Sequence, residues 1–422
     1  MTTFIEMHAL RSFPPSNLNR DDLGTPKTAV FGGARRLRIS SQCLKRTWRM
    51  SEHFRGGFAD GELGIRTDRL PGEVLKALGD TFEKSSGEGL VALLSSLGKK
   101  KAKEKAEDDG EDEAGAASLA QNAEADDAAS PRTAHLLFLS RQEIEAVVGF
   151  AREKTEALAK VFSKKKIDNK AVEKLRGELQ AHLETHTSKN AVDVGLFGRF
   201  VTSGEFDTVD GALQVAHALG TQKVEIEYDY FTAVDDLGDT TGAGHLGESE
   251  YASSVLYLYA CCDLGQLEQN LGARGAKGRQ PDKEARVLAR KSLPALVRAI
   301  AEATPKGKNT GTAPHTPAEY VEVVVRRGAP LSFANAFTKP VASREAEGDV
   351  MAASIARLTD HRDRIEAAYG RNKDAAARFV LCLRDVERPG ATAIQGVAVK
   401  TIAELAEKLA LALDALPAQA QP

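Results

Sequence analysis

Residues 18–46 read LNRDDLGTPKTAVFGGARRLRISSQCLKR, and this stretch decides the fold and the kind of surface that we expect. Its Pro, Asn and Asp residues predict an irregular loop. The alternation in RRLRIS then predicts a short strand with Arg36, Arg38 and Ser40 on one face. Ser41 is expected to cap the helix that follows.

That helix is expected to extend the polar surface, because four polar residues from Gln42 to Arg49 are spaced i, i+3, i+4 and i+7. Arginine and lysine suit phosphate oxygens, Asn, Ser and Gln can contact sugar hydroxyls, and Gly32 and Gly33 let a backbone come close. A polar helix face of this kind is often only a solvated surface. Here, however, a basic loop, a basic strand and this helix follow one another, which favours a binding surface. We predict a surface that binds a nucleic-acid strand of any sequence. Its residues are Asn19, Arg20, Lys27, Arg38, Ser40, Gln42, Lys45, Arg46 and Arg49.

Charge is segregated along the 422 residues, although the formal net charge is only -3. Residues 1–50 hold nine Lys or Arg against three acids, whereas residues 221–250 hold eight acids and the single basic residue Lys223. The basic N-terminal residues can attract nucleic acid, and the acidic central segment can attract a second copy of the chain.

Several classes of protein are excluded by composition. No uninterrupted apolar run reaches the roughly 18 residues that a membrane span requires, and the N-terminus lacks an apolar segment ahead of a cleavage site. The four cysteines have neither CxxC spacing nor the density of a disulfide scaffold, so structural zinc is not expected. Walker, nucleophile-elbow and HExxH motifs are absent. We expect a cytoplasmic protein without membrane contact, cofactor or metal.

The distribution of strands and helices favours an α+β fold. Residues 4–11 alternate in polarity like a half-buried strand. Beyond residue 190, strands are expected in VEIEYDYF, SVLYLYACC, YVEVVVRR and ARFVLCL, with helices at 284–302 and 401–413. Strands and helices mixed in this way, with one helical insertion, favour an α+β sheet domain over a doubly wound one.

The helical insertion is expected at residues 60–190. Ser140 and Glu143 form a capping box there, and a later helix carries Val172, Leu175, Leu179 and Leu183 at helical spacing. Residues 99–131 open with lysines and continue as an acidic, alanine-rich run, which matches a disordered surface loop.

Residues 18–46 closely resemble the start of the backbone subunit of type I-E CRISPR Cascade complexes, the CasC family. The resemblance covers most of the chain, apart from residues 99–131 and the C-terminal tail. It recurs in the same order downstream, in GLFGRFVTSG (195–204), QVAHAL (214–219), DYFTAVDDL (229–237), GAGHLG (242–247) and PLSFANAF (330–337).

The resemblance implies an RRM-like (ferredoxin-like) palm made of residues 1–59 and 191–422, a helical finger lobe at 60–190, and a thumb β-hairpin at about 217–250. It implies that copies stack head to tail along the spacer of a CRISPR guide RNA (crRNA). Each thumb would displace one nucleotide and leave the bases between thumbs to pair with target DNA. The implied partners are guide RNA, target DNA, copies of this chain, the large, small, guide 5′-end cap and guide-processing subunits of Cascade, and the helicase-nuclease recruited to the complex.

Carried over residue by residue, the resemblance assigns guide-RNA contacts to the positions of the predicted surface, Arg38 excepted. It adds Phe200 near the RNA backbone, and it makes Phe231, Thr232 and Leu246 thumb residues. Phe231 and Leu246 would separate guide bases. Glu225, Glu227 and Asp229 would face a basic neighbouring copy.

Two other functions remain open. Asp235, Asp236 and His245 could bind a hydrolytic metal and make the chain a thumb-aspartate, metal-dependent ribonuclease, although adjacent acids in a loop are usually turn or capping groups. A sequence-reading RRM regulator would need the RNP1 pattern, which is absent. We expect a non-catalytic subunit in which His8 and His217 are packing residues.

Overall fold

The computed structural model describes residues 2–97, 131–161, 168–187, 189–201, 204–234, 243–272, 281–342, 348–384 and 395–416. The loop predicted at 99–131 lies, apart from its last residue, outside the described residues. So do Asp235 and Asp236.

Within these ranges, ten strands form one mixed sheet. All neighbouring pairs are antiparallel except β11 and β12, which are parallel. The order along the sheet is β12 (Val397–Val399), β11 (Ala375–Cys382), β10 (Tyr320–Arg327), β1 (Thr3–Ser16), β9 (Ala243–Asp263), β7 (Ala218–Gly220), β3 (Ala34–Ile39) and β2 (Thr28–Phe31), while β6 (Leu213–Val215) and β8 (Glu227–Val234) also pair with β9. The expected α+β class is therefore confirmed.

Helices cover both faces of this sheet. One face packs on α1 (Ser41–Arg49), α2 (Glu52–Arg55), α10 (Leu264–Leu271), α11 (Lys283–Glu302) and α14 (Ile402–Asp414). The other face packs on the short helix η3 (Ala334–Phe337) and on α13 (Val350–Ala368). Two further short helices, α12 (Asn309–Thr312) and η4 (Asn372–Asp374), lie in connections.

The first strand is buried on both faces, which corrects the expected half-buried strand. Ile5 and Met7 belong to the core beneath α11, as the alternation predicted. Glu6 and His8, on the opposite face, are also fully buried because α13 and the segment before it cover them. The sheet is thus the middle of three layers.

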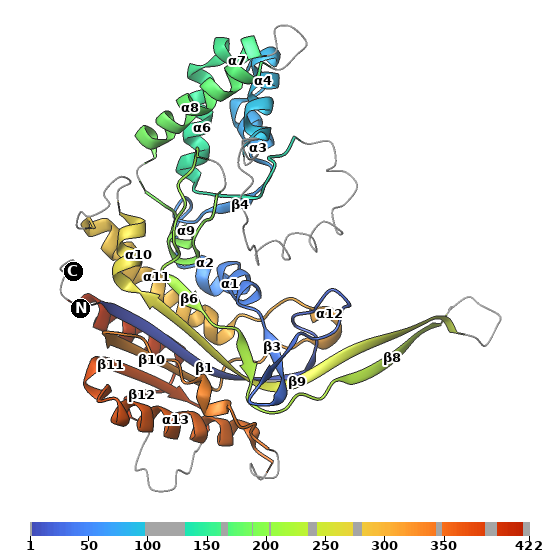
Figure 1. Cartoon of the computed structure of the whole chain (residues 1–422), viewed down its shortest axis with the longest axis vertical. Coiled ribbons are helices and arrows are strands. Elements are labelled where there is room, and N and C mark those ends of the chain that lie inside the picture. The colour runs from blue at the N-terminus through green and yellow to red at the C-terminus, as the bar shows by residue number, and fades with distance from the viewer. Residues whose placement is uncertain are drawn as a thin grey trace.

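A separate helical lobe lies at one end of the molecule (Figure 1). It contains α3 (Leu70–Leu78), α4 (Lys84–Ser95), α6 (Arg141–Glu153), α7 (Thr155–Val161), α8 (Asn169–His186) and a two-stranded sheet of β4 (Ile65–Thr67) and β5 (Leu137–Leu139). The lobe has its own core, in which Leu93, Phe150 and Leu179 are fully buried. The predicted capping box of Ser140 and Glu143 is confirmed at the start of α6.

A long two-stranded hairpin of β8 and the first half of β9 projects sideways from the sheet (Figure 1). The later half of β9 runs through the centre of the sheet beside β1. One strand therefore connects the core to the projecting hairpin. Among the described residues, no helix is both long and apolar enough to cross a membrane.

A buried ionic network joins the sheet to α13. The Arg326 guanidinium donates to Glu6 and to Glu366, with both N···O distances 2.7 Å. Arg362 and Arg378 pair with Glu322 at 3.0 and 2.9 Å. Burial raises the pKa of Glu322, but these two guanidinium groups outweigh burial and bring the pKa below its usual value. Charge balance inside this layer therefore depends on each arginine.

We predict that Arg326→Met destabilises the protein by about 3–5 kcal/mol, because Glu6 and Glu366 would keep buried charge without their shared cation. Arg364→Met is the matched control, since Arg364 lies on α13 with a side chain 77% exposed and pairs with Asp360 at the surface. It should cost less than about 1 kcal/mol. Urea unfolding measures both variants, and equal losses would contradict the importance of the network.

Candidate nucleic-acid interface

The loop before β2 folds back on the start of α1. The Ser40 amide donates to Asn19 Oδ1 at 2.8 Å, and the Lys27 amide donates to the Asn19 carbonyl at 2.8 Å. The Arg38 amide in turn donates to the Lys27 carbonyl at 2.9 Å. Asn19 therefore joins the predicted loop, strand and helix and brings their basic side chains together.

Six residues of the predicted surface present polar groups to solvent. Arg20, Gln42 and Arg46 are exposed, and Lys27, Arg38 and Lys45 are partly exposed. We call these six residues the basic surface. Burial raises the pKa of the Cys43 thiol, and the positive charges of Lys27 and Arg46 partly oppose that rise. Lys27 of the loop and Arg46 of α1 therefore both lie close enough to Cys43 to act on its thiol.

His217 belongs beside this surface, and the expectation that it is a packing residue is wrong. Its ring is exposed, and its Nδ1 lies 2.9 Å from the Arg38 guanidinium. Burial of part of the ring, followed by the charges of Arg38 and Lys27, lowers its pKa. The pairing of β7 with β3 brings it there, and no local pattern around QVAHAL indicates that pairing. His8, in contrast, is fully buried against Phe333, as expected.

The helix cap differs by one residue from the prediction. Ser40, not Ser41, is the N-cap of α1, and its hydroxyl accepts from the Cys43 amide at 3.3 Å. Ser40 is consequently buried to 7% exposure. Its side chain positions the helix that carries Gln42 and Lys45.

Arg49 does not lie on the exposed stripe, so this part of the prediction is wrong. Its guanidinium is buried 4.9 Å from the centre of the Phe138 ring and 3.7 Å from Asp193. Burial lowers the pKa of Arg49, and Asp193 partly restores it. Asp193 lies on α9 (Val192–Phe197) and also accepts from the Gly64 amide at 2.7 Å. Arg49 therefore holds α1 to the base of the helical lobe.

Arg36 is likewise structural, which corrects the expected basic face of β3. Its guanidinium is fully buried and donates to the carbonyls of Gly220, Thr221 and Phe337 at 2.8–2.9 Å. Gly32, in the preceding turn, has φ 59° and lies so close to Thr338 that a Cβ would be 1.7 Å from the Thr338 carbonyl oxygen. This glycine permits close approach to the protein's own backbone.

The projecting hairpin brings Phe231, Thr232 and Leu246 together. Phe231 pairs with Gly247 and Thr232 pairs with Leu246, and directly opposed residues share a face. Phe231 and Leu246 therefore lie on opposite faces of the ribbon. The Phe231 ring covers Gly247, where a Cβ would lie 2.3 Å from the ring. Leu246 is 68% exposed and Phe231 45% exposed.

Acidic and aromatic residues lie on both faces of the hairpin. Glu227 and Asp229 alternate with their neighbours so that they share the face of Phe231. Tyr228 and Tyr230 share the face of Leu246, and both are exposed. Glu248 and Glu250 oppose these tyrosines, so carboxylates occupy this face as well.

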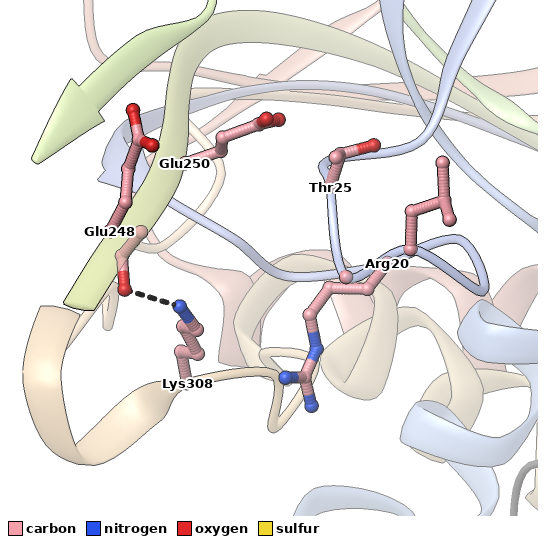
Figure 2. A pocket seen from close by; sticks show the side chains of 8 residues that line it. Arg20, Thr25, Glu248, Glu250 and Lys308 are labelled. Atoms are coloured by element: carbon pink, nitrogen blue, oxygen red, sulfur yellow. Dashed lines mark hydrogen bonds between the residues drawn. The ribbon is translucent and has the colours of Figure 1, made fainter.

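A polar cavity of about 290 Å³ lies where the hairpin meets the N-terminal loop (Figure 2). Lys308 donates to Ser249 Oγ at 2.8 Å and lies 5.4 Å from the centre of the Tyr251 ring. Arg20 approaches the cavity from the opposite side (Figure 2). The basic surface therefore reaches the base of the hairpin. The lining residues are Arg20, Leu23, Gly24, Thr25, Glu248, Ser249, Glu250 and Lys308.

Phe200 lies on another segment of the chain, and two of the alternative metal ligands are outside the described residues. Phe200 is 76% exposed on the segment that follows α9, next to Arg199, whose buried guanidinium binds Glu143 at 2.9 Å. The alternative metal ligands Asp235 and Asp236 are outside the described residues. Of His245, only the backbone is described, in β9.

Comparison with known proteins identifies the family. Residues 5–408 match the model of the CT1975-like proteins, and the chain belongs to this family. A chain in the structure of a "CRISPR RNA-guided surveillance complex, pre-nicking" is 27% identical, with a TM-score of 0.72, over 97% of this chain and 100% of that one. A second, from a "CRISPR RNA-guided surveillance complex", is 25% identical with a TM-score of 0.64, over 97% and 99%. No curated protein matches.

We predict that His217 titrates below the usual histidine pKa and is neutral at pH 7, because burial and the charges of Arg38 and Lys27 disfavour its protonated form. Arg38→Gln keeps a hydrogen-bond donor but removes the charge, so it should raise the pKa part of the way to the usual value. NMR titration of ¹⁵N-labelled histidine, assigned with His217→Gln, measures this. Arg364→Gln should leave it unchanged, and a wild-type pKa above 6.5 would contradict the prediction.

Proposed function

We propose that this chain is a non-catalytic backbone subunit of a type I-E CRISPR surveillance complex, Cascade, and that it binds the guide RNA without reading its sequence. The observation that carries the proposal is the basic surface, which lies in a fold shared over 97% of the chain with a subunit of a CRISPR RNA-guided surveillance complex. Membership of the CT1975-like family supports the same assignment.

The basic surface is suited to phosphates. Arg20 and Arg46 are exposed, and guanidinium groups donate to two phosphate oxygens at once, whereas Lys27 and Lys45 supply point charges. Gln42 and the ring of His217 offer donors to sugar hydroxyls. None of these contacts identifies a base, so sequence recognition is left to pairing between guide and target.

The hairpin supports a role as the thumb, with the sheet as an RRM-like palm and the helical lobe as the finger. It projects far from the sheet (Figure 1). Phe231, Leu246 and the carboxylates of Glu227 and Asp229 are exposed on it. In this proposal it displaces one guide nucleotide and contacts the next copy. A head-to-tail contact that does not close into a ring produces an open helix, as a linear guide requires.

The proposal includes the partners of such a complex. These are target DNA paired to the exposed guide bases, the large, small, guide 5′-end cap and guide-processing subunits, and a helicase-nuclease recruited after target binding. We place the complex in the cytoplasm. A backbone role needs no cofactor, no catalytic metal and no nucleophile from this chain.

Replacing Lys45 and Arg46 together by Ala should weaken binding equally for unrelated guide RNAs, because both side chains are proposed to contact phosphates. If each contact is lost, the slope of log K against log salt should fall by about 1.4. Fluorescence anisotropy over a range of KCl concentrations measures both quantities. The matched control is Arg364→Ala with Lys373→Ala, which removes two exposed cations from α13 and from η4, the short helix that follows it.

Weakening confined to one RNA would contradict phosphate binding and favour base recognition. The same samples, incubated with Mg²⁺ or Mn²⁺, should yield intact RNA. Cleavage that Asp235→Ala or Asp236→Ala abolishes would instead support the thumb-aspartate ribonuclease.

Phe231→Ala with Leu246→Ala should leave RNA binding by one subunit nearly unchanged, because the basic surface is intact, but should abolish the regular array. Chemical probing of the guide should then lose its periodic reactivity. Charge reversal of Glu225, Glu227 and Asp229 to Lys should reduce the number of copies bound, as measured by native mass spectrometry.

Phe231→Ala and Leu246→Ala, tested singly, distinguish the contributions of the two faces of the hairpin, because the two residues lie on opposite faces. Tyr369→Ala with Leu383→Ala removes two other exposed apolar side chains and is the control. Wild-type periodicity and copy number in the hairpin variants would rule out this role for the hairpin.

A further inference from the structure

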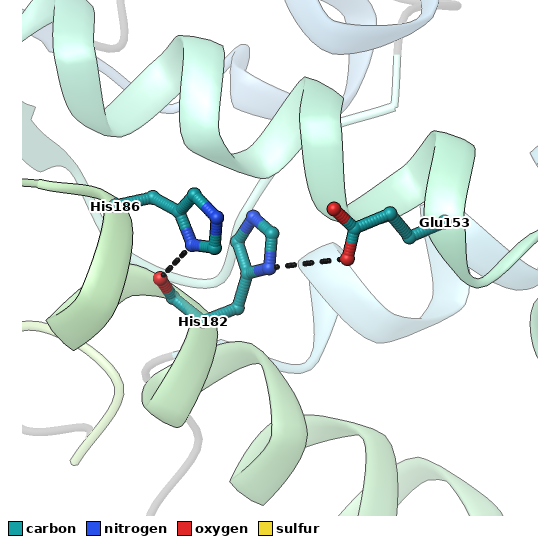
Figure 3. A group of neighbouring side chains, drawn as sticks. All are labelled: Glu153, His182 and His186. Atoms are coloured by element: carbon teal, nitrogen blue, oxygen red, sulfur yellow. Dashed lines mark hydrogen bonds and ion pairs between the residues drawn. The ribbon is translucent and has the colours of Figure 1, made fainter.

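Two histidines and a glutamate from α6 and α8 meet in the helical lobe (Figure 3). Glu153 is the last residue of α6, and His182 and His186 lie one turn apart near the end of α8. One ligand atom from each residue can be chosen so that all three atoms lie within 4.8 Å of one another. His182 Nδ1 is 3.5 Å from Glu153 Oε2.

The hydrogen bonding of His186 prepares one of its nitrogens for a metal. Its Nδ1 lies 2.9 Å from the His182 carbonyl oxygen, and a carbonyl can only accept, so Nδ1 carries the proton. Nε2 then bears the lone pair. A backbone carbonyl that fixes the imidazole tautomer in this way is a usual outer partner of a metal-binding histidine.

The two imidazoles lie directly against each other. Their rings are stacked with centres 3.8 Å apart and planes 16° apart. An ordinary ion pair accounts for His182 beside Glu153, but it does not require a second imidazole stacked on the first.

We propose that Glu153, His182 and His186 form a binding site for one divalent transition-metal ion, with Zn²⁺ the best match to two imidazoles and a carboxylate. Water would complete four-coordination, because Glu153 and His186 are exposed. The metal would join the end of α6 to the end of α8. The cysteine-based argument against zinc does not apply to these ligands.

The geometry requires a small adjustment. Bonds of about 2.0–2.2 Å in a tetrahedral site place ligand atoms roughly 3.4 Å apart, so atoms that now lie within 4.8 Å must approach by at most about 1.4 Å. Glu153 is exposed at a helix end and can move. The nearby Lys154 ammonium opposes a cation, but Glu178 Oε2 pairs with it at 2.7 Å and offsets its charge. We therefore expect a site of moderate affinity.

The test uses the full chain, freed of metal by a chelator that is then removed, with ZnCl₂ alone as the probe. Isothermal titration calorimetry should give one Zn²⁺ per chain, and Co²⁺ should give the visible absorption of tetrahedral coordination. His186→Ala and Glu153→Gln, both at exposed positions, should each weaken Zn²⁺ binding by more than about tenfold. Binding should also weaken as pH falls through the histidine pKa range, because protons compete for the imidazoles.

His53→Ala is the matched control, because His53 also pairs with a glutamate, Glu302, at 3.6 Å but is outside the lobe. It should bind Zn²⁺ like the wild type. No stoichiometric binding by the wild type, or binding that His186→Ala and Glu153→Gln leave unchanged, would overturn the proposal. Because no RNA is present, the result is independent of the proposed role in a surveillance complex.

Discussion

The buried guanidinium of Arg36 holds the basic surface and the base of the hairpin in one position. It donates to four backbone carbonyls, from Gly220 and Thr221 at the end of β7 and from Phe337 and Thr338 at the end of η3. Burial, followed by the nearby charge of Arg357, lowers its pKa. No carboxylate is among these four acceptors, so carbonyl dipoles replace water around the charge. The guanidinium therefore joins β3 to the end of β7 and to the end of η3.

The neighbouring residues on β3 show what the sequence could and could not predict. Alternation correctly predicted that Arg36 and Arg38 share a strand face, and it predicted the helix that presents Gln42 and Arg46. It could not show that η3, some 300 residues later, covers Arg36 and leaves Arg38 partly exposed. Arg49 is the same case, because α9 and the Phe138 ring cover the end of its helix. Whether a cation binds solvent or protein depends on segments distant in sequence.

The main elements of the sheet were predictable for the opposite reason. β10, β11, α11 and α14 are continuous apolar or amphipathic segments whose period identifies them. α13 was not predicted, because its buried side includes Thr359, Arg362 and Glu366 beside Ile355. The charges of Arg362 and Glu366 are compensated there because Glu322 and Arg326 face them from the sheet. A pattern of apolar residues cannot reveal a layer that ion pairs hold together.

The register of the hairpin constrains how the proposed thumb can contact an RNA strand. Phe231 shares its face with Glu227 and Asp229, and these carboxylates would repel phosphates on that side. Leu246 shares its face with Tyr228 and Tyr230, on which bases can stack, but also with Glu248 and Glu250. Both faces of the ribbon would therefore offer apolar or aromatic side chains to bases and carboxylates that repel phosphates. Phosphates would be left to the basic surface, where Arg38 and Arg46 supply positive charge, so separation of bases and retention of the backbone fall to different parts of the chain.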